Sequence, residues 1–90
     1  MEKLKIWKQT LRLVDYQKIM LPIDADMLDV QIRDGNICIW FMCTPGEEMR
    51  ERGFYIVGTG HSVPDAADVY VGTVQKDDFV WHVFMGDNYE

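Results

Sequence analysis

The sequence predicts an all-β protein, a small antiparallel β-sandwich or barrel of six to seven short strands with at most one short helix, in a single domain over residues 1–90. Apolar residues alternate with polar ones at a period of two in most segments. Turn-forming residues separate these segments at intervals of about 8–14 residues. No segment has a convincing apolar helical face, and the 48% hydrophobic and 12% aromatic composition excludes a disordered chain.

The first half of the chain predicts four strands. Residues 4–13 mix apolar and basic side chains, which is typical of a half-exposed edge strand protected by lysines. Residues 17–21 predict a short strand that Pro22 ends. Residues 28–33 and 37–43 predict a hairpin around a tight turn at residues 34–36, where Gly35 and Asn36 tolerate positive φ. Residues 37–43 are apolar on both faces, which predicts a central strand covered on both sides.

The second half predicts a loop and three further strands. Residues 44–53 contain one apolar residue, Met49, so we expect a mobile charged loop there or a helix of one or two turns. A strand follows at 54–57 and a turn-rich segment at 58–65, and strands at 69–74 and 79–84 pair across residues 75–78. Gly58 and Gly72 within strand patterns indicate bulges or a close backbone approach.

Charge is distributed unevenly along the chain, whose net charge is −6. Residues 1–18 carry five basic and two acidic side chains, whereas residues 19–90 carry four basic and thirteen acidic ones. Such a surface repels phosphates, which disfavours direct nucleic-acid binding and favours a basic partner surface. The candidate protein-binding acids are Asp24, Asp26, Asp29, Asp34, Asp65, Asp68, Asp77 and Asp78.

Several other classes of protein are disfavoured. The longest apolar run, Ile37–Cys43, is too short to span a bilayer, and no apolar core of signal-peptide length follows the N-terminal lysines. Cys38 and Cys43 lie five residues apart in one predicted strand, about 16 Å, on opposite faces, so we expect free thiols in a reducing compartment. The histidines and cysteines match no recognised zinc pattern, so we expect no metal and no cofactor.

The glycine-rich turn Gly58-Thr59-Gly60-His61-Ser62 is the candidate ligand site. Two glycines allow close backbone approach, exposed amides can cradle a phosphate, and a histidine can bind it when charged. The alternative is a strand exit whose histidine caps a turn. His82, among apolar neighbours, is expected to be a hydrogen-bonded core or interface residue. No serine or cysteine lies in a nucleophile motif, so we expect no enzyme activity.

Four segments stand out in order along the chain: residues 5–8 (KIWK), 54–61 (ending GTGH), 72–75 (GTVQ) and 79–84 (FVWHVF). Together they resemble a family of small, functionally unassigned bacteriophage and prophage proteins, and Ser62 departs from the proline expected after the histidine. The resemblance implies an accessory protein acting in the cytoplasm of a bacterial host, and it supplies no catalytic residues.

These observations lead to competing hypotheses of function. The first is a non-enzymatic inhibitor that binds a basic surface on a host defence or nucleic-acid-processing protein. The second is a protein that binds or sequesters a nucleotide-type signal through the Gly58–His61 turn, and the third is a virion component. A small domain rich in Trp and Tyr is also a candidate homo-oligomer.

Overall fold

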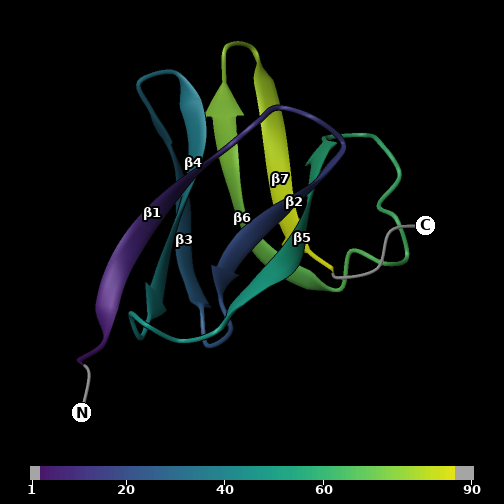
Figure 1. The fold of residues 1–90 in the computed structure, drawn as a ribbon. Helices are drawn as coiled ribbons and strands as arrows, with labels where there is room; N and C mark the ends of the chain where they lie inside the picture. The colour runs from purple at the N-terminus through teal and green to yellow at the C-terminus, as the bar shows by residue number, and fades with distance from the viewer. Residues whose placement is uncertain (1–2, 87–90) are drawn as a thin grey trace.

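The computed structural model describes residues 3–86, which form seven β-strands and no helix (Figure 1). The strands are β1 (Lys5–Leu11), β2 (Tyr16–Pro22), β3 (Asp26–Arg33), β4 (Asn36–Cys43), β5 (Met49–Gly58), β6 (Val69–Lys76) and β7 (Phe79–Met85). In the described residues no helix is long and apolar enough to cross a membrane.

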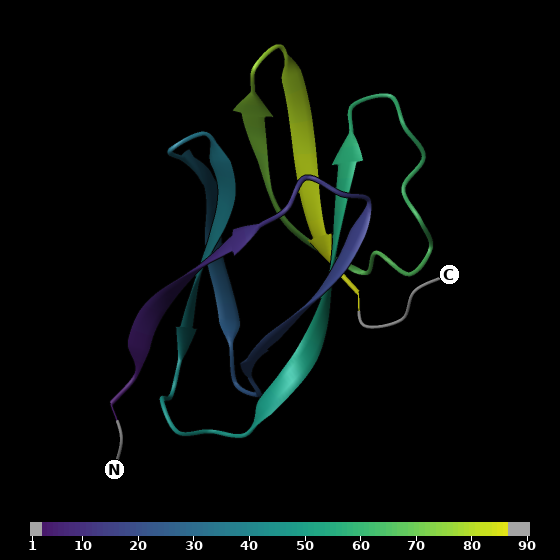
Figure 2. The ribbon, with the colours of Figure 1, turned by 45° about the horizontal axis from the view of Figure 1, so that its top comes forward.

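The strands form two antiparallel sheets that face each other as a sandwich, not a closed barrel (Figure 2). Sheet A has the order β1-β4-β3, and sheet B has the order β2-β5-β7-β6. Every pairing is antiparallel. The all-β prediction is therefore confirmed, and of its two architectures the sandwich is the one found.

The main core lies between the two sheets. Sheet A contributes the inward side chains of β4, and Phe54, Ile56 and Val83 of sheet B pack against them. Strand β4 is central in its sheet, as predicted. The prediction that both of its faces are covered holds fully for the inward face and in part for the outward face, where Cys38 is buried but Trp40 and Met42 are only half-buried.

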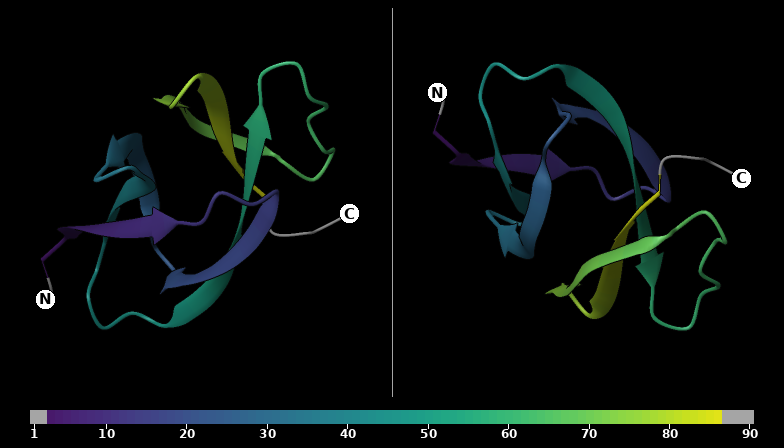
Figure 3. Two further views of the ribbon diagram at one scale, coloured as in Figure 1. Left: turned by 90° about the horizontal axis from the view of Figure 1, so that it is seen from above. Right: turned by 90° about the horizontal axis from the view of Figure 1, so that it is seen from below.

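The sandwich closes along one side and diverges along the other, as the end views show (Figure 3). On the closed side β3 packs against β6. Gly72 lies at a register shift in the β6–β7 pairing, and a Cβ built on it would overlap Cγ1 of Val30. The bulge falls at Val71, directly before Gly72, and Gly72 provides the close approach, so both features predicted from a glycine in a strand pattern occur here.

The prediction of a charged loop or short helix over residues 44–53 is wrong for its second half. Met49–Gly53 begin β5 and pair with residues 18–22 of β2. This half of β5 is polar because it lies against an edge strand near the open side, where its side chains reach solvent. Backbone pairing, rather than side-chain alternation, makes it a strand.

Both predicted hairpins are present, with tighter turns than predicted. In the first, Asp34 (φ 51°) and Gly35 (φ 79°) are the two positive-φ residues between Arg33 and Asn36. Positive φ at both central positions defines a type I′ turn, which matches the twist of the strands. In the second, Asp77 and Asp78 alone form the turn, and residues 75 and 76 belong to β6.

Candidate functional site

The Gly58–His61 segment forms a type II turn at the end of β5. The His61 N–H donates to the Gly58 carbonyl at 3.0 Å, and Gly60 has φ 91°. The Thr59 N–H donates to the Val80 carbonyl at 3.2 Å. Two of the amides that would cradle a phosphate are thus already used by backbone carbonyls, so recognition here depends on side chains.

The turn is joined to β7 through the side chain of His82. Pairing of β5 and β6 with β7 places Val57 and Thr73 on either side of His82. The Thr59 hydroxyl lies 2.8 Å from His82 Nε2, and the Thr73 hydroxyl lies 2.9 Å from Nδ1. Both ring nitrogens therefore have partners, as expected, but the half-buried ring lies on the outer face of sheet B and not in the core.

The hydrogen bonds of this cluster have a consistent direction when His82 is neutral. The Thr59 hydroxyl donates to the Val80 carbonyl at 3.4 Å, so it accepts from His82 Nε2–H. Nδ1 then accepts from Thr73, and Tyr70, 2.5 Å away, donates to the Thr73 hydroxyl. Tyr70, Thr73, His82 and Thr59, which we call the histidine cluster, form one polar row on the outer face of sheet B.

His61 lies beside the histidine cluster and borders three shallow hollows. Their volumes are about 280 Å³ (also lined by Thr59 and His82), about 270 Å³ (also lined by Asp15 and Ser62) and about 360 Å³ (also lined by Thr59 and Asp78). Two are below the range of about 300–1,000 Å³ that is typical of ligand pockets, and the third is at its lower end. The structure thus brings His61 and His82 to one site, a pairing that the sequence pattern did not predict.

Six of the eight predicted acidic residues flank two strands. Asp24, Asp26, Asp29 and Asp34 lie in or next to β3, and Asp77 and Asp78 form the turn after β6. Asp65 lies in the loop between β5 and β6, and Asp68 lines a hollow together with Arg52. Because β3 and β6 pack together, the other six residues border the closed side of the sandwich. We call them the acidic edge.

Basic residues concentrate on the opposite side. Seven of the nine lie on or next to β1, β2 and the first half of β5: Lys3, Lys5, Lys8, Arg12, Lys18, Arg50 and Arg52. The remaining two, Arg33 and Lys76, accompany the acidic edge. The two sides of the sandwich therefore carry opposite charge. Strands β4 and β7 carry no Asp, Glu, Lys or Arg.

Two members of the acidic edge also have local structural roles. Asp29 accepts hydrogen bonds from the Val30 N–H and the Gln31 amide, both at 2.8 Å. The two carboxylate oxygens of Asp24 lie 3.1 and 3.0 Å from the Thr44 N–H. Hydrogen bonds from the Thr44 side chain and backbone lower the pKa of Asp24.

The lowered pKa predicts a pH-dependent effect of Asp24→Ala. A carboxyl whose pKa is lower in the folded state stabilises that state above its unfolded pKa of about 4 and loses this effect as pH falls further. The variant should melt below the wild type at pH 7, and the difference should shrink below pH 4. Thermal melts between pH 2.5 and 7 test this. Asp26→Ala is the control, and a difference for Asp24→Ala that stays constant with pH would contradict the prediction.

The cysteines are buried and free, as predicted. Burial, and secondarily the charge of Asp24, raise the pKa of Cys43, which disfavours the reactive thiolate. Among the described residues no group of three His, Cys, Asp or Glu side chains is placed to hold a metal ion.

A hollow of about 530 Å³, larger than those beside His61, lies between β1 and β2 and contains none of the predicted site residues. Its walls depend on the pairing of β2 with β5, which the sequence pattern did not indicate. This hollow could not be predicted from the sequence, because its walls form only when residues 16–22 pair with residues 49–55.

Fold and surface together define a small antiparallel β-sandwich with opposed acidic and basic sides. The chain belongs to the family described as a domain of unknown function (DUF7352), whose family model matches residues 2–90. A search of the curated proteins finds no match to the chain, and a search of the solved structures finds none either.

Proposed function

We propose that the protein is a phage accessory protein without enzyme activity, acting in the bacterial cytoplasm, that inhibits a host protein by covering a basic surface with its acidic edge. The observation that carries the proposal is the separation of charge across the sandwich. Six aspartates border β3 and β6 on the closed side, while seven of the nine basic residues lie on or next to β1, β2 and the first half of β5. A partner that holds nucleic acid on a basic surface would meet carboxylates in place of phosphates.

The aspartates at the ends of the two hairpins are exposed. Strands β3 and β6 run towards the same end of the sandwich, where Asp34 and the pair Asp77 and Asp78 form the turns (Figures 1 and 2). Asp77 lies 3.4 Å from the Lys76 ammonium, an exposed pair that water screens. Within the described residues, Asp34 and Asp78 form no ion pair, so their charge is available to a partner.

The test compares two triple variants with the same change in net charge. Asp34→Asn, Asp77→Asn and Asp78→Asn neutralise the hairpin ends, and asparagine tolerates the positive φ found there. Glu47→Gln, Glu48→Gln and Glu51→Gln are the control on the opposite side. Each protein is immobilised, exposed to host lysate and eluted with increasing salt. We expect wild type and control to retain the same basic protein, and the hairpin variant to lose it at about 0.1–0.2 M lower salt, because the interaction is screened.

Two results would count against the acidic-edge proposal. One is that nothing elutes in a salt-dependent manner. The other is that both triple variants lose the partner equally, which would assign the effect to net charge alone.

The histidine cluster favours a second candidate function, the binding of a nucleotide-type small molecule. His61 and His82 border one hollow, and Tyr70, which is exposed and contacts Phe84 edge-on at 5.5 Å, offers an aromatic surface for a base. A ligand at about 100 times its Kd adds about 2.7 kcal/mol, which raises the Tm of a domain of this size by about ten degrees or more. We expect one member of a nucleotide panel to give such a shift, and His61→Ala to remove it. Shifts that persist in His61→Ala, with Asp65→Asn as the control, would exclude this site.

A further inference from the structure

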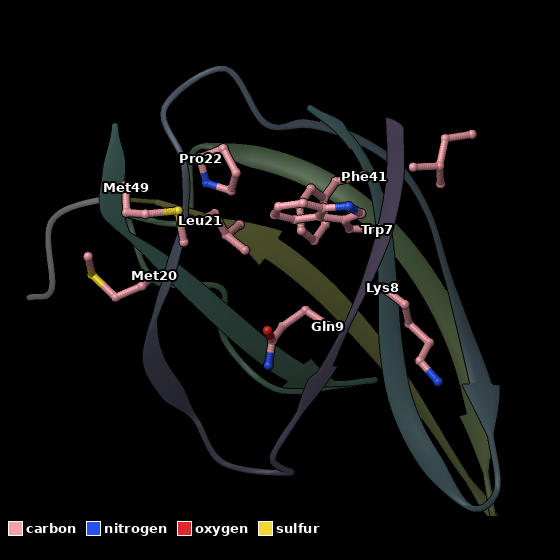
Figure 4. A pocket seen from close by; sticks show the side chains of 9 residues that line it. Trp7, Lys8, Gln9, Met20, Leu21, Pro22, Phe41 and Met49 are labelled. Atoms are coloured by element: carbon pink, nitrogen blue, oxygen red, sulfur yellow. The ribbon is translucent and has the colours of Figure 1, made fainter. Parts of the chain in front are cut away.

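On the open side of the sandwich, a groove separates the edge strands β1 and β2. It has a volume of about 530 Å³, and apolar side chains from both sheets line it: Trp7, Met20, Leu21, Pro22, Phe41 and Met49. In Figure 4 the rings of Trp7 and Phe41 form one wall, and Leu21, Pro22 and Met49 form the other. Trp7 is 38% exposed and packs edge-on against Phe41 at 6.3 Å between ring centroids. The groove is therefore an accessible apolar surface.

The backbone of β1 borders this groove without a strand on its outer side. Sheet A has the order β1-β4-β3, so β1 pairs with β4 alone in the described chain. Roughly every second residue of an edge strand directs its N–H and C=O outwards, which is a template for an added strand. An added strand places alternate side chains on the inner face of the sheet, which here faces the groove.

The charge around the groove is positive, in contrast to the rest of the surface. Lys5 and Lys8 lie on β1 and Lys18 on β2, while Arg50 pairs opposite the groove residue Leu21. Residues 3–22 and 44–53 together carry seven basic and four acidic side chains. Of the acids, Glu48 is paired with Arg50 at 3.8 Å. A segment that docks here is favoured when it is acidic.

We infer that the groove and the free edge of β1 together bind an acidic, extended segment of a partner protein, which adds to sheet A as a strand and inserts alternate apolar side chains beside Trp7. This surface lies opposite the acidic edge and is independent of the function proposed for it. Its occupant pairs main chain with β1, neutralises Lys5 and Lys8 and covers the exposed part of the Trp7 ring.

A second copy of the chain fits this surface less well. Pairing of β1 with β1 across a twofold axis would bring the lysines of two copies together, which is unfavourable. The acidic edge of another copy presents most of its aspartates from turns, and only Asp26 and Asp29 lie within a strand. An acidic strand from a different protein has neither disadvantage.

The experiment uses two capped eight-residue peptides, one alternating glutamate with valine and one alternating lysine with valine. Binding is measured by fluorescence anisotropy of the labelled peptide, and hydrogen exchange of the β1 amides is followed by NMR. We expect the glutamate peptide to bind and to slow exchange along β1, and the lysine peptide to do neither. Trp7→Ala should weaken binding about tenfold while the protein retains its cooperative melt, because a half-exposed side chain contributes more to an interface than to the core.

Matched charge reversals separate a local effect from one of net charge. Lys5→Glu with Lys8→Glu should weaken binding of the glutamate peptide about tenfold or more. Arg33→Glu with Lys76→Glu, an equal change in net charge on the other side, should weaken it no more than about twofold.

Four results would overturn the inference. They are equal binding of the lysine peptide, equal loss in both double variants, binding of an eight-residue oligothymidylate with the same dependence on Lys5 and Lys8, and a concentration-dependent dimer that Trp7→Ala dissociates. The third result would assign the groove to single-stranded nucleic acid, and the fourth would assign it to a second copy of the chain.

Discussion

Replacing Gly72 with alanine should lower the free energy of unfolding by about 3 kcal/mol or more, among the largest effects that a single methyl group produces. The new Cβ would overlap Cγ1 of Val30, a buried residue of the facing strand β3. Neither strand can withdraw without opening the closed side of the sandwich, where β3 and β6 pack together. We therefore expect a large loss of stability or failure to fold.

Urea denaturation of Gly72→Ala, Val30→Ala and the double variant measures this effect. Val30→Ala removes the methyl group that the new Cβ would meet, so the double variant should be clearly more stable than the sum of the two single losses implies. Additive losses, or a Gly72→Ala variant as stable as the wild type, would show that the close approach of β3 and β6 is not a packing constraint.

Phe54→Ala should be similarly damaging, with a loss of about 3–5 kcal/mol. Phe54 is 0% exposed and packs in the main core between the two sheets. Phe79→Ala makes the same chemical change at a residue that is 63% exposed and should cost less than about 1 kcal/mol. Because a domain of this size is only marginally stable, Phe54→Ala is expected to be largely unfolded at 37 °C.

Circular dichroism and thermal melts of the two phenylalanine variants provide the measurement. Equal losses at the two positions would contradict the burial pattern on which the sandwich depends. A small loss at Phe54 alone would indicate that the core repacks around the cavity.

The strands that were predicted correctly can be predicted from the local sequence pattern alone. Both hairpins join residues close in the chain through two-residue turns, so alternation and turn chemistry suffice to predict them. Residues 49–53 are different, because they are polar and become a strand only by pairing with β2, about thirty residues earlier in the chain. Local periodicity contains no information on such a partner.

The candidate sites also combine features that the local sequence predicts with features that depend on long-range strand pairing. The aspartates were evident from the sequence, but the common position of six of them on the closed side requires the packing of β3 against β6. The proximity of Thr59 to His82 requires β5 and β7 to pair, and the groove beside Trp7 requires β2 to lie in the other sheet from β1. Residue types thus indicated the chemistry, and long-range strand pairing decided which residues meet.

The sheet order has a consequence for the synthesis of the protein on the ribosome. Sheet A is complete once residue 43 has left the exit tunnel, but β5 of sheet B pairs with β7, which ends at Met85. Until then the layer opposite β4 contains at most β2 and β5 and lacks β6 and β7, and long-range pairing of this kind is slow. The nascent chain is therefore expected to expose an aggregation-prone surface to chaperones until its last strand emerges.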